Sequence, residues 1–217
     1  MTSPLPFQIT VARQLGSGGA ELGQRIACRM GFVYLDRQIL QQVAQELGIS
    51  EAEVAGREDR IKSFWVRIME TFSAGCPEYM MSNPPPRIIS DDTLIETEQR
   101  VLLHLAAGGS CVIVGRCGFH LLAGRAPLLN VFVHASRSFR IERMIKLYGA
   151  SSRSVAEEMI DETDRNREQY VEIIAKKLWY DARNYHLSID LSQTGLDMAE
   201  EMIVLLANRM VDLNSEP

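Results

Sequence analysis

The sequence predicts an α/β fold in which a parallel sheet of about five strands carries helices on both faces. Short apolar segments, typical of buried strands, alternate along the chain with longer segments of helical periodicity. Residues 111–114, CVIV, lack polar alternation, which is typical of a central parallel strand that is covered on both sides. A glycine-rich turn joins the first strand to the first helix, and the alternation then continues to the end of the chain.

Helix boundaries are marked by glycines and by serine caps. Gly31, Gly48 and Gly149 are the expected C-terminal caps of the helices that follow the first, second and fourth strands. Ser154 with Glu157 forms a capping box, which predicts that a long and strongly charged helix begins there. The expected strands occupy residues 9–12, 32–35, 111–114, 129–133 and 185–191.

One domain is expected over residues 1–217, because this length suits a single substantial core with one embellishment. The core is expected to span about residues 7–48 and 90–212. The intervening residues, about 49–89, have less regular helical patterns and end in SNPPP, a segment that is excluded from helix and sheet interiors. They are interpreted as a helical insertion between the second and third strands.

Composition excludes several classes of function. A net charge of −5 disfavours a general affinity for nucleic acid or for anionic membranes. No apolar run approaches the roughly 18 residues of a membrane span, and the first residues lack the pattern of a signal peptide. Four cysteines without a C-x-x-C pair favour reduced thiols, and the four histidines are scattered singly, without the spacing of metal ligands. We therefore expect a cytoplasmic protein.

The turn after the first strand is a candidate phosphate site. Gly16, Gly18 and Gly19 remove side chains from a loop that opens a helix, so that backbone N–H groups and the helix dipole favour an anion. The loop departs from the pattern G-x-x-x-x-G-K-[ST]. With Gly18 set on the last glycine, Arg13 stands at the first glycine, Gly19 at the lysine and Ala20 at the hydroxyl residue. A turn that only reverses the chain remains an alternative.

Polar residues follow the ends of the other expected strands. Asp36 and Arg37 come after the second strand, and Gly115 and Arg116 after the third. Because ligands of open parallel sheets bind at the carboxyl ends of the strands, these residues and the glycine turn are expected at one rim.

Six segments, taken in order, resemble the cytidylate kinase-like family of the P-loop nucleoside monophosphate kinase superfamily. The resemblance extends from residue 9 to about residue 203. It depends on the order and the spacing of the segments, since no single one is specific. They are ITVARQLGSGGAELGQRIA from residue 9, YLDRQIL from 34, VIVGR ending at 116, VFVHAS ending at 136, DETDRNR from 161 and NYHLSID from 184.

The resemblance implies a P-loop NTPase-type fold and transfer of the γ-phosphoryl group of ATP, with Mg²⁺, to CMP or a related monophosphate. It also implies a helical lid over about residues 150–182, and a charged helix with a weak apolar stripe suits a mobile element. Contacts of arginines with phosphate are expected to affect turnover more than folding. The implied donor-binding residues are Gly16, Ser17, Gly18, Gly19, Ala20 and Glu21; the implied acceptor-binding residues are Asp36, Arg37, Arg116 and Asp164; and the catalytic candidates are Arg13, Arg116, Arg165 and Arg167.

Other interpretations stay open. Asp161 and Arg165 are four residues apart on a helix, and such a pair usually does no more than solvate an exposed face. Gly19 in place of the lysine favours either a substitute cation, with Arg13 as the candidate, or a module that binds nucleotide or phosphate without turnover. A kinase for a small metabolite is a third possibility. The expected partners are small-molecule nucleotides, whereas the acceptor and the oligomeric state are left open by the sequence.

Overall fold

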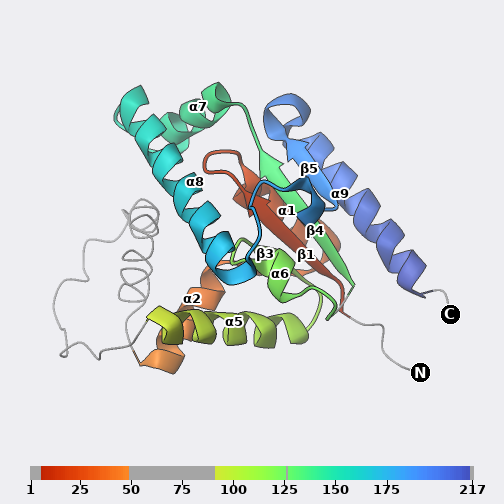
Figure 1. The fold of residues 1–217 in the computed structure, drawn as a ribbon. Helices are drawn as coiled ribbons and strands as arrows, with labels where there is room; N and C mark the ends of the chain where they lie inside the picture. Colours follow the sequence, from red (N-terminus) through yellow and green to blue (C-terminus); the bar gives the residue numbers. More distant parts are fainter. Residues whose placement is uncertain (1–5, 49–90, 126, 216–217) are drawn as a thin grey trace.

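The computed structural model describes residues 6–48, 91–125 and 127–215. Within them, five parallel strands form one sheet in the order β2-β3-β1-β4-β5 (Figure 1). This arrangement confirms the predicted α/β class and parallel sheet. The expected insertion, about residues 49–89, lies outside the described residues. The strands are β1 (Gln8–Arg13), β2 (Val33–Leu35), β3 (Cys111–Val114), β4 (Leu128–His134) and β5 (Leu187–Asp190).

Three of the expected helix ends are confirmed. Gly31, Gly48 and Gly149 each take a left-handed conformation directly after a helix, where glycine carries no steric penalty. In no described helix is there a stretch long and apolar enough to cross a membrane. The helices are α1 (Gly19–Met30), α2 (Arg37–Leu47), α5 (Asp91–Ala107), α6 (Gly118–Leu121), α7 (Arg137–Tyr148), α8 (Arg153–Ala175) and α9 (Leu191–Ser215), with a short 3-10 helix at Ala182–Asn184.

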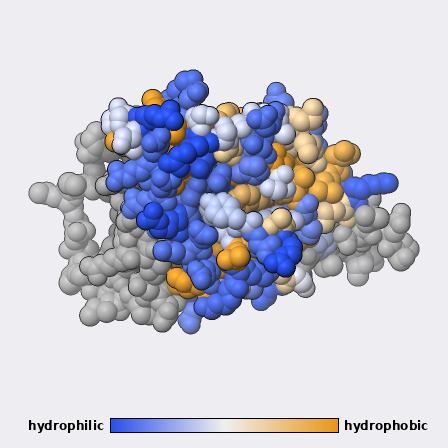
Figure 2. All heavy atoms as spheres, turned by 45° about the horizontal axis from the view of Figure 1, so that its top comes forward, coloured by the Kyte–Doolittle hydropathy of each residue, from blue (hydrophilic) through white to orange (hydrophobic). Residues whose placement is uncertain are grey.

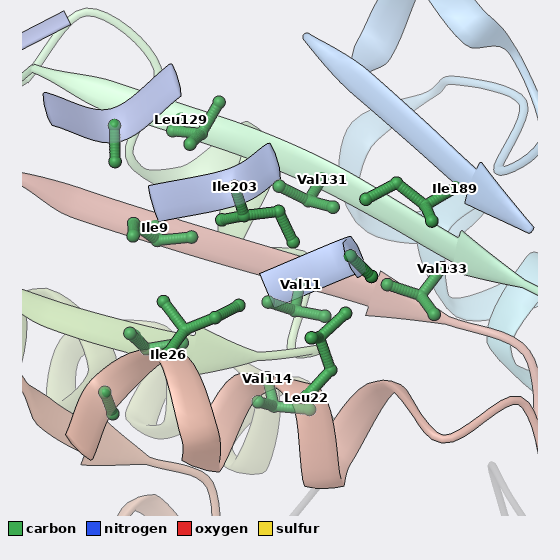
Figure 3. Close-up of a cluster of buried hydrophobic side chains, with 14 of the residues drawn as sticks. Ile9, Val11, Leu22, Ile26, Val114, Leu129, Val131, Val133, Ile189 and Ile203 are labelled. Atoms are coloured by element: carbon green, nitrogen blue, oxygen red, sulfur yellow. The ribbon is translucent and has the colours of Figure 1, made fainter. Parts of the chain in front are cut away.

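One face of the sheet is covered by α1 and α9 (Figure 1). Leu22 and Ile26, one helical turn apart on α1, are completely buried against this face together with Ile203 of α9. Figure 3 shows these side chains converging on alternate residues of the strands, as the two-residue period of a strand requires. The strand residues in this cluster include Ile9, Val11, Val114, Leu129, Val131, Val133 and Ile189.

The opposite face has two separate covers. Helices α2, α5 and α6 pack on the β2–β3 side, where Ile113 and Leu35 are buried. The C-terminal half of α8 packs on β1 and β4, where Tyr170 and Val171 meet Phe132. The remaining part of α8 pairs with α7 beyond the carboxyl ends of the strands (Figure 1). The two helices therefore stand next to the edge at which ligands of such sheets bind.

The start of α8 differs from the sequence-based prediction. The cap is Ser152, whose hydroxyl accepts a hydrogen bond from the Val155 N–H at 3.2 Å. Ser154 instead lies in the first turn of the helix, so its expected capping box is wrong. The backbone of Ser152 is extended, which allows its side chain to reach the first free N–H groups of the helix two residues earlier than expected.

Candidate functional site

The glycine loop between β1 and α1 presents free backbone donors. Gly16 has φ 74° and Gly18 has φ 94°, both in the left-handed region that glycine tolerates. Over the described part of the chain, no protein acceptor is hydrogen-bonded to the backbone N–H groups of Gly16, Gly18 and Gly19. These groups stand at the N-terminus of a twelve-residue helix, whose dipole also attracts negative charge. The local geometry is thus that of a phosphate-binding loop.

Helices α7 and α8 hold this loop in place through a buried ion pair. One carboxylate oxygen of Asp164 accepts a hydrogen bond from the Leu15 N–H at 2.8 Å, and the other accepts from Arg140 at 2.5 Å. The same guanidinium nitrogen of Arg140 donates to the Leu15 carbonyl at 3.2 Å. The three groups are buried, so the loop conformation is coupled directly to α7 and α8.

A cavity of about 500 Å³ opens in front of the loop. Tyr34 and Asp36, at the end of β2, line it opposite the glycines, and Tyr34 Oη donates to the Asp36 carboxylate at 3.3 Å. Burial raises the pKa of Tyr34, so the phenol stays protonated as a donor. The volume of the cavity is that of a typical small-ligand pocket. Figure 2, in which the top of Figure 1 comes forward, shows a mostly hydrophilic surface on this side of the molecule.

Arg13, at the end of β1, lies between this cavity and a smaller one. A β-carbon added to Gly19 would be 2.5 Å from Arg13 Cβ, and one added to Gly115 would be 2.0 Å from Arg13 Nη1. The side chain therefore runs across Gly19 and ends over Gly115, at the carboxyl end of β3. Arg13 and Arg167 line both cavities, and the smaller one, about 40 Å³, also contacts Arg116.

A second buried guanidinium adjoins Arg13. Arg167 of α8 donates to the Arg13 carbonyl oxygen at 2.6 Å, and only 11% of its side chain is exposed. Burial, together with the charge of Arg13, lowers the pKa of Arg167 to about 9, and burial also lowers the pKa of Arg13. Two neighbouring cations that disfavour each other's charge are stabilised by an anion placed between them.

Arg116 is buried and forms an ion pair with Glu98 of α5. The second Glu98 oxygen accepts a hydrogen bond from Tyr170 Oη at 2.9 Å. Sequence reasoning missed Glu98, although its position offered a signal: it is in helical phase with Leu94, Val101 and Leu102, all of which are buried. A carboxylate on an apolar helix face requires a buried cation as a partner.

Arg143 of α7 was also missed. Its guanidinium lies 3.6 Å from the place where a β-carbon on Gly18 would stand, and it donates to the Glu21 carboxylate at 2.8 Å. Both residues line the larger cavity. The available signal was its position on α7 one turn after Arg140. The structure thus adds a cation next to the glycine loop.

The remaining candidate residues occupy different positions. Arg165 is exposed and lines neither cavity, unlike Arg167 two residues later. Ser17 is buried, and its hydroxyl donates to the Gln14 carbonyl at 2.8 Å. Ala20 and Glu21 line the larger cavity. The side chain of Arg37 lies outside the described residues.

Comparison with known protein families gives a match over residues 8–193 to the model of the cytidylate kinase-like family. The chain belongs to the cytidylate kinase-like family. Its P-loop kinase fold is also seen in solved structures. An uncharacterized protein from Eubacterium ventriosum superposes with a TM-score of 0.68 at 18% identity, covering 93% of this chain and 98% of that one. Shikimate kinase from Bacteroides thetaiotaomicron superposes with a TM-score of 0.52 at 11% identity, with the same coverages. No curated protein sequence matches this chain.

Proposed function

We propose that this member of the cytidylate kinase-like family transfers the γ-phosphoryl group of ATP to CMP or a related nucleoside monophosphate. The observation that carries the proposal is the shared cavity of the glycine loop and Asp36, with Arg13 and Arg167 at its inner boundary. Phosphoryl transfer requires mainly alignment and positive charge around the moving group. Free N–H groups on one side and buried guanidinium groups at the boundary supply both.

The donor would bind on the glycine loop. The N–H groups of Gly16, Gly18 and Gly19 face no competing protein acceptor within the described chain, which fits an anionic phosphate group. Arg143, beside Gly18, adds a positive charge to the same site. Mg²⁺ typically binds through one or two carboxylates and the phosphates, and Glu21 and Asp36 are the carboxylates that line the cavity. When bound, Mg²⁺ would neutralise charge on the phosphates.

The acceptor would bind on the β2–β3 side. Asp36 and Arg37 follow β2, and Arg116 follows β3. The ion pair with Glu98 restricts the guanidinium of Arg116 to one orientation, which would favour bidentate contact with a phosphate. Arg167 on α8 would approach from the lid side, where the proposed lid extends over about residues 150–182. Asp164 lines neither cavity, and its two oxygens hold Leu15 and Arg140, so it would act through the conformation of the glycine loop.

A second candidate is a nucleotide-binding module without turnover, and the glycine at position 19 favours it. The two are separated by measuring ADP formation from ATP and Mg²⁺ over CMP, dCMP and UMP, together with calorimetric binding of ATP and ADP. We expect ATP binding and ADP formation that depends on one monophosphate. Binding of ATP without ADP formation in the presence of any of these monophosphates would support the binding module. Absence of ATP binding would refute both candidates.

A further inference from the structure

Compared with the P-loop pattern, the large and the small residue are exchanged between positions 13 and 19. In that pattern the first position is glycine and the other is the lysine that contacts the β- and γ-phosphates. This chain has arginine at the first position and glycine at the second. In the structure the two residues face each other: an ideal β-carbon on Gly19 would be 2.5 Å from Arg13 Cβ and 3.1 Å from its Cγ. There is space for only one side chain.

Contact with Arg13, not backbone conformation, requires glycine at position 19. Gly19 is the first residue of α1 and lies outside the left-handed region that holds Gly16 and Gly18. An L-residue is therefore compatible with its backbone. The third neighbour of an added β-carbon is Val133 Cβ at 3.3 Å, which would need to move by only a few tenths of an ångström. Rotation of the Arg13 side chain cannot relieve the collision with its Cβ, because that atom is bonded directly to the backbone.

The charged end of Arg13 reaches the boundary between the two cavities. Its guanidinium lies over Gly115, whose lack of a side chain leaves the space that Nη1 occupies. From there it lines the cavity of the glycine loop and also the smaller cavity beside Arg116. The negative charge of Asp36 raises the pKa of Arg13 and so opposes part of the lowering that burial causes. The glycine loop, Asp36 and Arg13 all line the larger cavity, so a phosphoryl group that moves from the loop toward Asp36 stays within a cavity that Arg13 lines.

We infer that Arg13 is a catalytic residue that replaces the P-loop lysine, and that Gly19 is glycine because Arg13 crosses it. The inference rests on the proposed function and names the cation of that site. In the reaction, the bond from the γ-phosphorus to the oxygen it shares with the β-phosphate breaks. A bond forms to an oxygen of the acceptor phosphate, which yields ADP and a nucleoside diphosphate. Arg13 transfers no proton and stabilises the charge on the oxygens of the moving group.

The steric half of the inference is tested without nucleotide. Thermal midpoints are compared for wild type, Gly19→Ala, Arg13→Gly and the double variant. At the start of a helix, alanine is normally tolerated better than glycine. We expect Gly19→Ala to lower the midpoint when Arg13 is present and to have little effect, or to raise it, in the Arg13→Gly background. Equal effects of Gly19→Ala in both backgrounds would show that the two substitutions are independent. That result would overturn the claim that Arg13 requires glycine at position 19.

The charge half is tested by restoring the standard pattern. Arg13→Gly should reduce phosphoryl transfer by roughly 100-fold or more, the scale of one lost transition-state contact. Adding Gly19→Lys should recover at least tenfold of that loss, because the lysine then has the space of Arg13. Arg13→Lys and Arg13→Gln give a second comparison that needs no change at Gly19. The lysine variant should retain more transfer than the glutamine variant. Arg100→Ala, an exposed arginine on α5, is the control and should match wild type.

Calorimetric affinity for ATP is measured on the same proteins, so that the inference is decided even if transfer is absent. Loss of affinity in Arg13→Gly and recovery in the double variant would support Arg13 as the substitute cation. If wild type binds ATP but forms no ADP with any monophosphate, the proposed function and the catalytic role of Arg13 both fail, while this affinity pattern still decides whether Arg13 is the substitute cation for the phosphates. Affinity and transfer that do not change in Arg13→Gly or Arg13→Gln, with the proteins folded, would overturn it.

Discussion

The carboxylate of Asp164 and the backbone N–H of Leu15 are hydrogen-bonded at 2.8 Å although 149 residues separate them in the sequence. The bond connects α8 to the residue that precedes the glycine loop. Arg140 of α7 completes the arrangement by donating to the second oxygen of Asp164 and to the Leu15 carbonyl. Any movement of α8 relative to the sheet therefore acts on the backbone of the glycine loop. The conformation of the loop depends on helices that are distant in sequence.

We predict that Asp164→Asn weakens nucleotide binding and lowers stability together. An asparagine can still accept from Leu15, but one of its two positions becomes an NH₂ group that cannot accept from Arg140. A buried guanidinium then loses its partner, at a cost of about 3–5 kcal/mol in the free energy of unfolding. Urea unfolding and ADP calorimetry measure the two effects. The control is Asp161→Asn on the exposed side of α8, where the pair with Arg137 is largely solvated. Wild-type behaviour of Asp164→Asn would refute the coupling.

Replacing Gly18 tests the loop itself. Gly18→Ala should cost about 1–2 kcal/mol of stability, because φ is 94° and the left-handed region is unfavourable for alanine. The added methyl group would also lie 3.2 Å from Leu191 and close to Arg143, so ADP affinity should fall by at least tenfold. Gly31→Ala is the matched control: φ is 66° at the other end of α1, and a β-carbon there meets nothing within 4 Å. Both variants should lose similar stability, but only Gly18→Ala should lose ADP binding. Equal affinities would exclude the loop as the donor site.

The ion pair of Arg116 and Glu98 changes the expectation for Arg116. Sequence reasoning predicted an effect on turnover with little effect on folding, whereas the pair is buried on both sides. Arg116→Ala should lower the free energy of unfolding by about 3–5 kcal/mol, since it leaves Glu98 buried without its cation. Glu98→Gln should be milder, because the amide oxygen still accepts a hydrogen bond. Arg100 is on α5, like Glu98, and forms an exposed ion pair with Glu46 of α2, so Arg100→Ala should cost less than about 1 kcal/mol. Thermal and urea unfolding of the three variants decides the order.

Much of the architecture was predictable because it depends on local chemistry. The alternation of strand and helix patterns, the buried run of β3 and the glycine caps at Gly31, Gly48 and Gly149 all act through residues that are close in sequence. The prediction for the start of α8 was wrong, and the cause is also local. Three serines lie within residues 151–154, and the backbone conformation of Ser152 decided which one caps the helix. Local patterns indicate that a helix begins but place the first residue less well.

The candidate site divides in the same way. The sequence alone determined that a glycine loop follows the first strand, that Asp36 and Arg116 follow two others and that all three belong to one edge of a parallel sheet. Tertiary structure decided what each side chain does there. It turned Arg116 toward Glu98, exposed Arg165, brought Arg143 to Gly18 and laid Arg13 across Gly19. The physical reason is range: backbone conformation and periodicity are local, whereas the packing of a side chain depends on surfaces contributed by distant elements.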